Sequence, residues 1–132
     1  MGTAPAQPQA TVCLTFDFDA MSLWMNWGAR GPQALSRGEF GAKVGAPRLL
    51  ELFDQYGIRS TWFVPGHTAD TYPELTASVA ERGHEIGNHG YLHETFDLLD
   101  DDGTRAVLRK ANDTLERVTG SRPRGFRLPA RR

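Results

Sequence analysis

The apolar residues of this 132-residue chain follow two spacings, one typical of strands and the other typical of helices. Short apolar or β-branched runs predict four strands, at residues 11–18, 60–64, 84–87 and 125–128. Between them lie three segments with helical spacing, which end at glycines: Gly57, Gly83 and Gly120. This alternation of strands and helices predicts repeated βα units, an α/β fold and a parallel sheet.

Polar residues mark where two of these helices begin. Thr71, with Glu74 three residues later, predicts a capping box at the start of the second helix. Asp101 or Asp102 is predicted to cap the third helix. Both signals place a side-chain oxygen beside backbone N–H groups that the first helical turn leaves without partners.

Residues 20–42 show no clear period, so we expect a long irregular connection there. Connections of this length are usually functional or mobile. The segment holds Trp24 and Trp27, which either close one end of the sheet or line a substrate pocket.

Composition narrows the function classes. Lys plus Arg is 15 and Asp plus Glu is 16, a balance that predicts neither a nucleic-acid partner nor a membrane surface. No apolar run approaches the ~18–20 residues of a membrane span. Cys13 is the only cysteine, which excludes an intramolecular disulfide and fits a reducing compartment. Residues 1–10 are rich in Ala, Pro and Gln and lack a signal-peptide core, so we expect a disordered leader and a cytoplasmic protein.

Side chains able to carry chemistry follow three of the four predicted strands. Asp17 and Asp19 end the first strand, His89 and His93 follow the third, and Arg127 closes the fourth. The carboxyl ends of parallel strands meet at one edge of a sheet, where α/β proteins place their sites. We therefore expect these side chains to converge there.

The spacing within each pair favours a metal. Carboxylates two residues apart on a strand point to the same face, and their repulsion calls for a proton or a cation. Histidines four apart share one side of a helix or tight turn. Two histidines and one carboxylate form an open site that suits Zn²⁺, with Co²⁺ and Ni²⁺ as alternatives. His67, after the second strand, is a candidate for contact with substrate.

Three segments resemble the motifs of the polysaccharide deacetylases, the NodB-homology group or carbohydrate esterase family four: LTFDFD at 14–19, GHEIGNHGYLH at 83–93 and GFRLP at 125–129. The first two are similar to the intracellular branch, which includes peptidoglycan-deacetylase-like, cyclic-imide-hydrolysing and allantoinase-like proteins. The resemblance assigns residues 11–132 to this domain and implies an irregular (β/α) barrel.

The resemblance also implies roles for individual residues. Asp17 would be the general base, Arg127 would orient it, and the metal would be held by three ligands: Asp19, His89 and His93. The extracellular form of the motif has adjacent acids, whereas Phe18 separates them here. Substrate contacts are expected from the remaining candidates, Trp24, His67 and Tyr91, with a backbone N–H near Tyr91 beside the developing oxyanion.

The implied activity is metal-dependent hydrolysis of a non-peptide carbon–nitrogen bond, the deacetylation of an N-acetylated glycan. One alternative is hydrolysis of a small cyclic imide or ureide by the same site. A (β/α) barrel takes ~250 residues, so four strands predict only the N-terminal half of the domain, without the later motifs that supply a general-acid histidine. An inactive fragment or binding module is therefore a third interpretation.

A partial barrel leaves one strand edge unpaired. We therefore expect aggregation unless a partner supplies the remainder, and a homo-oligomer is one such arrangement.

Overall fold

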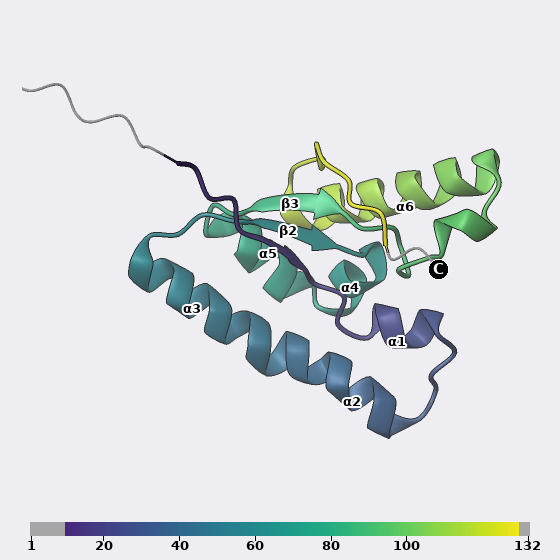
Figure 1. Ribbon diagram of the computed structural model, residues 1–132, viewed down its shortest axis with the longest axis horizontal. Helices are drawn as coiled ribbons and strands as arrows, with labels where there is room; N and C mark the ends of the chain where they lie inside the picture. Colours follow the sequence, from purple (N-terminus) through teal and green to yellow (C-terminus); the bar gives the residue numbers. More distant parts are fainter. Residues whose placement is uncertain (1–9, 130–132) are drawn as a thin grey trace, which may run out of the picture.

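The structure, a computed structural model, describes residues 10–129. In that range a sheet of three parallel strands has the order β1 (Thr15–Asp17), β2 (Thr61–Val64) and β3 (Glu85–Asn88). Strands adjacent in the sequence are therefore neighbours in the sheet, as the βα rhythm predicts. Their carboxyl ends point the same way and bring Asp17 and Asn88 to one edge (Figure 1).

Helices connect the strands and cover one face of the sheet. They are α1 (Ser22–Asn26), α2 (Pro32–Phe40), α3 (Ala46–Tyr56), α4 (Gly66–Thr71), α5 (Pro73–Glu81) and α6 (Asp101–Thr119). A π-helical turn (Gly41–Gly45) joins α2 to α3, and a 3₁₀ turn (Phe96–Leu98) precedes α6. Helices α2 and α3 run on as one long rod, while α6 lies on the β3 side of the sheet (Figure 1).

The pleat of the strands separates a buried face from an open one. Phe16, Trp62 and Ile86 are opposite one another in the register, and Trp62 and Ile86 are buried against the helices. The next row, Asp17, Phe63 and Gly87, points to the other face. The hydrophobic core therefore lies between the sheet and the helices, and Asp17 is the predicted site residue that the register places on the open face.

The connection predicted as irregular at 20–42 is largely helical, so that prediction was wrong. It contains α1, α2 and the start of the π-helical turn. Pro32 stands at the first position of α2, where its missing N–H removes no helical hydrogen bond. The π-helical turn precedes Pro47, which cannot donate to the carbonyl four residues back.

Two predicted helix starts were also wrong. Thr71 is the last residue of α4, and its hydroxyl donates to the carbonyl of His67 instead of capping α5. Asp100, one residue before the two predicted candidates, caps α6 by accepting from the N–H of Gly103. The predicted stops at Gly57 and Gly120 are confirmed, because both adopt the left-handed conformation that ends a helix.

Two predicted strands are shorter than expected. The first covers only Thr15–Asp17, because β2 is its one neighbour in the part of the chain that the structure describes. The run at 125–128 makes a single parallel bridge, between Asn88 and Phe126. The predicted leader at residues 1–10 lies, apart from Ala10, outside the described range.

Among the helices of residues 10–129, none combines the length and the apolar character that a membrane crossing requires.

Candidate metal centre

Asp19, His89 and His93 come together at the carboxyl edge of the sheet. Asp19 Oδ1 lies 3.5 Å from His89 Nε2, and Asp19 Oδ2 lies 3.7 Å from His93 Nε2. One ligand atom from each residue lies within 4.8 Å of the other two. Ligand atoms about 2.0–2.2 Å from a tetrahedral zinc ion stand roughly 3.3–3.6 Å apart, so the two distances from Asp19 to the histidines are close to those of a metal site.

The hydrogen bond made by His89 determines which of its nitrogens is available. Its Nδ1 lies 2.8 Å from the carbonyl oxygen of Arg127. A carbonyl only accepts, so Nδ1 carries the proton and donates it, and the neutral ring keeps its lone pair on Nε2. Nε2 is the atom that faces Asp19. This hydrogen bond thus fixes the orientation of the ring, as is usual for histidines that bind a metal.

The electrostatics of the cluster call for a cation. Asp19 Oδ1 is buried and accepts no hydrogen bond within the described residues. The atom that faces it, His89 Nε2, presents a lone pair and has no proton to donate. Burial raises the pKa of the Asp19 carboxyl above its ordinary value, and His93 and His89 offset only part of that effect. Burial also lowers the pKa of the His89 imidazole, which favours the neutral, ligating form. The donor set therefore fits a divalent metal.

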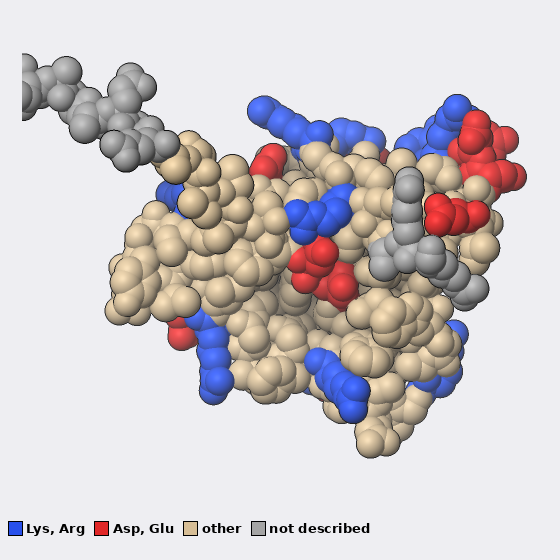
Figure 2. Space-filling view, in the orientation of Figure 1, with Lys and Arg blue, Asp and Glu red and all other residues tan. Residues whose placement is uncertain are grey.

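Arg127 connects the second acid to the cluster. Its Nη1 donates to Asp17 Oδ1 at 2.6 Å, and its Nη2 donates to Thr15 Oγ1 at 2.6 Å. Both side chains of the ion pair are roughly one third exposed or more, so the pair aims Asp17 more than it stabilises the fold. In the space-filling view, acidic side chains lie beside a basic one in a hollow over the carboxyl end of β1 (Figure 2).

The ring of Phe63 supports the guanidinium of Arg127 from below. The guanidinium carbon lies 4.1 Å from the ring centroid, close enough for a cation–π contact. Gly87, the neighbour of Phe63 in the sheet, makes room for that ring, because a Cβ on Gly87 would lie 2.6 Å from it. The glycine in the HEIGN segment is therefore part of the support of the site.

The loop from His89 to His93 is held by its own polar groups. Asn88 accepts from the N–H of Gly90 and donates to Asn112 on α6. Glu94 accepts from the backbone N–H groups of Tyr91 and Leu92. The Tyr91 N–H is thus already used within the loop, and a backbone N–H near Tyr91 beside the oxyanion stays a prediction.

The three predicted substrate contacts lie in different surroundings. The Tyr91 hydroxyl donates to Asp70 on α4, and Lys110 Nζ lies 3.5 Å from the centre of its ring, so this side chain is engaged between α4 and α6. His67 Nδ1 lies 3.1 Å from Ser22 Oγ beneath the turn that carries Asp19. Trp24 lines a cavity of about 280 Å³ together with both acids of the first motif. Contact of these residues with substrate stays a prediction.

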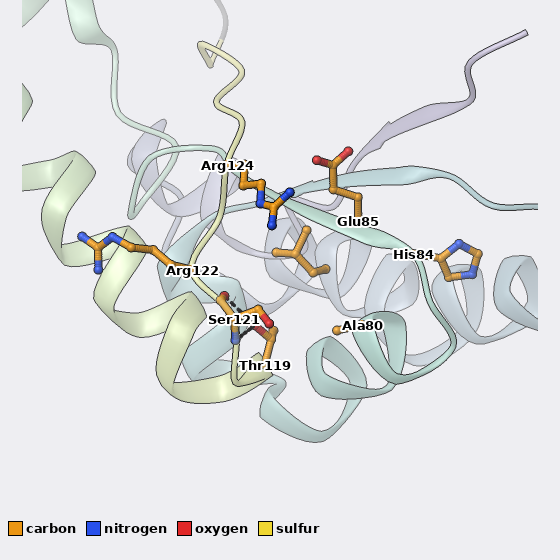
Figure 3. Close-up of a pocket in the computed structure, with 8 residues that line it drawn as sticks. Ala80, His84, Glu85, Thr119, Ser121, Arg122 and Arg124 are labelled. Atoms are coloured by element: carbon orange, nitrogen blue, oxygen red, sulfur yellow. Dashed lines mark hydrogen bonds between the residues drawn. The ribbon is translucent and has the colours of Figure 1, made fainter. Parts of the chain in front are cut away.

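A second cavity lies at the opposite end of the sheet. It measures about 310 Å³ and is bordered by the amino end of β3 and the carboxyl end of α6 (Figure 3). The residues that line it, among them Glu85, Thr119 and Arg124, include none of the predicted site residues. This cavity is therefore separate from the metal cluster.

Sequence reasoning missed three polar side chains of the site, Thr15, Ser22 and Thr68. Thr15 shares the strand face of Asp17, so period-2 spacing could have found it. Ser22 and Thr68 meet across 46 residues of sequence, and their hydroxyls lie 2.8 Å apart. No local pattern connects these two residues.

A family model described as polysaccharide deacetylase matches residues 4–132. The chain belongs to the polysaccharide deacetylase family. Its matched residues include all three metal-site candidates, and the resemblance inferred from the motifs is confirmed.

Three relatives place the chain within this family. It is 39% identical to peptidoglycan deacetylase-like protein FGM2 of Gibberella zeae, over 98% of this chain and 40% of that protein. It is 38% identical to a peptidoglycan deacetylase of Helicobacter pylori, over 86% of this chain and 39% of that protein. The crystal structure of a Mycobacterium smegmatis protein assigned to the polysaccharide deacetylases matches 98% of this chain with a TM-score of 0.84 and 38% identity.

The chain spans only part of each of these proteins, 40% and 39% of the two curated relatives and 48% of the crystallised chain. Its three parallel strands match part of the deacetylase barrel, as the predicted fold class requires.

Proposed function

We propose that this chain forms the metal-binding and general-base part of a deacetylase that hydrolyses the amide bond of an N-acetylated glycan. The observation that supports the proposal is that the Asp19–histidine cluster and the Asp17–Arg127 ion pair lie together at one edge of the sheet. Asp19 faces both histidines, while Arg127 holds Asp17 and also binds His89 through its carbonyl. The names of the relatives, two of them peptidoglycan deacetylases or proteins like them, support a glycan substrate.

In this proposal Asp19, His89 and His93 hold a divalent ion, for which we favour Zn²⁺. When bound, such an ion lowers the pKa of a water molecule and polarises a carbonyl group. Within the chain, burial lowers the pKa of His89 and so favours its neutral form, and the Arg127 carbonyl keeps its Nε2 lone pair directed at the cluster. Three protein ligands are the number with which catalytic zinc sites usually hold the ion.

Asp17 is the proposed general base. Its carboxylate is about 40% exposed, so a water molecule can reach it, and it lies two residues from Asp19. Arg127 binds one of its oxygens, Oδ1. The other oxygen is left to accept the proton of the attacking water, a role that needs hydrogen-bond reach and a fixed direction.

The test compares two substrates on the zinc-loaded 132-residue chain. We expect release of acetate from N-acetylglucosamine oligosaccharides, and a loss of about 10²-fold or more in Asp17→Asn, as for removal of a general base. Asp102→Asn is the matched control, because Asp102 lies on an exposed part of α6 with 97% of its side chain accessible.

Turnover of a cyclic imide instead of the glycan would contradict the proposed substrate and leave the metal centre standing. A chain that binds zinc but turns over neither compound would contradict the assignment of activity to these 132 residues.

A further inference from the structure

A buried chain of hydroxyl groups lies beneath Asp19. Ser22 on α1 and Thr68 on α4 are both fully buried, with their hydroxyl oxygens 2.8 Å apart. Thr68 Oγ1 donates its proton to the backbone carbonyl of Asp19 at 2.7 Å. Thr68 must then accept from Ser22, and Ser22 in turn must accept from Nδ1 of His67 at 3.1 Å, because each hydroxyl has one proton. The direction of every bond is fixed.

The carbonyl of Asp19 is held twice. Besides Thr68, it accepts the backbone N–H of Ser22 at 2.9 Å, so both of its lone pairs are used. The next residue, Ala20, has φ of 47°, a left-handed conformation that is unfavourable for a residue with a Cβ. The turn after β1 therefore needs contacts from elsewhere to keep its shape, and the hydroxyl chain supplies one set of them.

Gly38 on α2 supplies an independent contact from another side. A Cβ on Gly38 would lie 2.4 Å from the carbonyl oxygen of Ala20 and 2.8 Å from the Cα of Met21. Both are backbone atoms, so no side-chain rotation could relieve the clash. The helix backbone thus lies directly against the turn, at a distance that only glycine permits.

We infer that Thr68, Ser22, His67 and Gly38 are positioning residues that hold the Asp19 turn so that its carboxylate meets the two histidines. The inference rests on the proposed metal centre and adds to it the parts that preorganise one ligand. Residues that orient metal ligands typically change metal affinity by 10–100-fold when replaced. His67, predicted from the sequence to contact substrate, acts here through Ser22 and Thr68.

The test measures Zn²⁺ and Co²⁺ binding to the metal-free 132-residue chain by calorimetry, without any assay of activity. Thr68→Val removes the hydroxyl and keeps the side-chain shape, and we expect metal affinity weaker by about tenfold or more. Thr68→Ser retains the hydroxyl and should bind like the wild type. Gly38→Ala should weaken binding to a similar extent, whereas a Cβ at Gly41 meets nothing within 4 Å, so Gly41→Ala should bind normally.

Urea unfolding of each metal-free variant separates positioning from stability. We expect the loss of affinity in Thr68→Val to persist under conditions in which the variant is fully folded. If Thr68→Val does not fold, Ser22→Ala takes its place, because it removes the two hydrogen bonds of the Ser22 hydroxyl, to Thr68 and His67, that fix the Thr68 hydroxyl against the carbonyl of Asp19. Folded variants that bind both metals like the wild type would overturn the inference. A wild-type chain that binds neither metal would instead contradict the proposed metal centre itself.

Discussion

Replacing Asp19 with asparagine should have opposite effects on stability in the absence and presence of zinc. The side chain is 21% exposed, and its Oδ1 is buried and receives no hydrogen bond from residues 10–129. An unsatisfied buried group costs about 1–3 kcal/mol. Asparagine removes the charge and offers an N–H to the lone pair of His89, so we expect the metal-free variant to be more stable by about 1–2 kcal/mol. Its melting temperature should rise by roughly 3–10 °C.

Zinc should reverse this order. At a free zinc concentration of about 100 times the dissociation constant, the wild type gains about 2.7 kcal/mol through mass action, while the variant lacks one ligand and gains far less. Differential scanning calorimetry of both chains with chelator and with zinc measures the four melting temperatures. The reasoning is refuted if the metal-free variant is no more stable than the wild type, or if zinc raises both temperatures equally.

The pH dependence provides a second check on the same variant. Because burial raises the pKa of Asp19, the folded metal-free chain holds this proton more tightly than the unfolded chain does. Stability from this group is therefore present at low pH and is lost as pH rises through the raised value. The wild type should lose stability relative to Asp19→Asn as pH rises from 4 towards 7.

Three further outcomes are expected. Gly87→Ala should displace the Phe63 ring and with it Arg127, and so lower glycan turnover at least tenfold. Gly125→Ala, whose Cβ would lie 4.0 Å from that ring, should leave turnover unchanged, and equal turnover by both variants would contradict the role of Phe63 in supporting Arg127. Burial lowers the pKa of His84 in the folded chain, so on acidification the unfolded chain binds this proton at a higher pH than the folded chain does, and the free energy of unfolding measured in urea should fall below about pH 6.5. If the free energy of unfolding of His84→Asn depended on pH in the same way as that of the wild type, His84 would not be the cause of this fall. Zinc affinity measured by calorimetry should fall below about pH 6 as protons compete for the histidine ligands, and a constant affinity down to pH 5 would argue against histidine ligation.

Local patterns predicted how three strands alternate with the helices α3, α5 and α6, because that alternation depends on short-range spacing. The glycine stops at Gly57 and Gly120 are confirmed for this reason, since each needs only a left-handed residue after an amphipathic helix. Strand length was less predictable. Val12 and Leu14 look like strand residues, but a strand also requires a neighbour, and this part of the chain is exposed.

The spacing of His89 and His93 predicted that the two imidazoles lie close together, but it did not predict the backbone conformation that brings them together. They lie on a loop in which Gly90 and His93 both have positive φ, and the loop is fastened by Asn88 and Glu94. The Asp-x-Asp pattern left the roles of Asp17 and Asp19 open, because both point to the same side of an ideal strand. The structure separates them through partners more than sixty residues away, a distinction that no local pattern contains.

Arg127 contacts both the proposed metal ligands and the proposed base. Its backbone carbonyl accepts a hydrogen bond from His89, and its guanidinium donates one to Asp17. Seating of residues 125–129 against β3 thus assembles ligand and base in a single event, and detachment of this segment would abolish both together. Mutagenesis can separate the two functions in one direction only. Arg127→Gln would remove the ion pair with Asp17 and leave the His89 imidazole aligned. The bond to His89 is made by the backbone carbonyl, which every amino acid has, so no side-chain replacement can remove that bond alone.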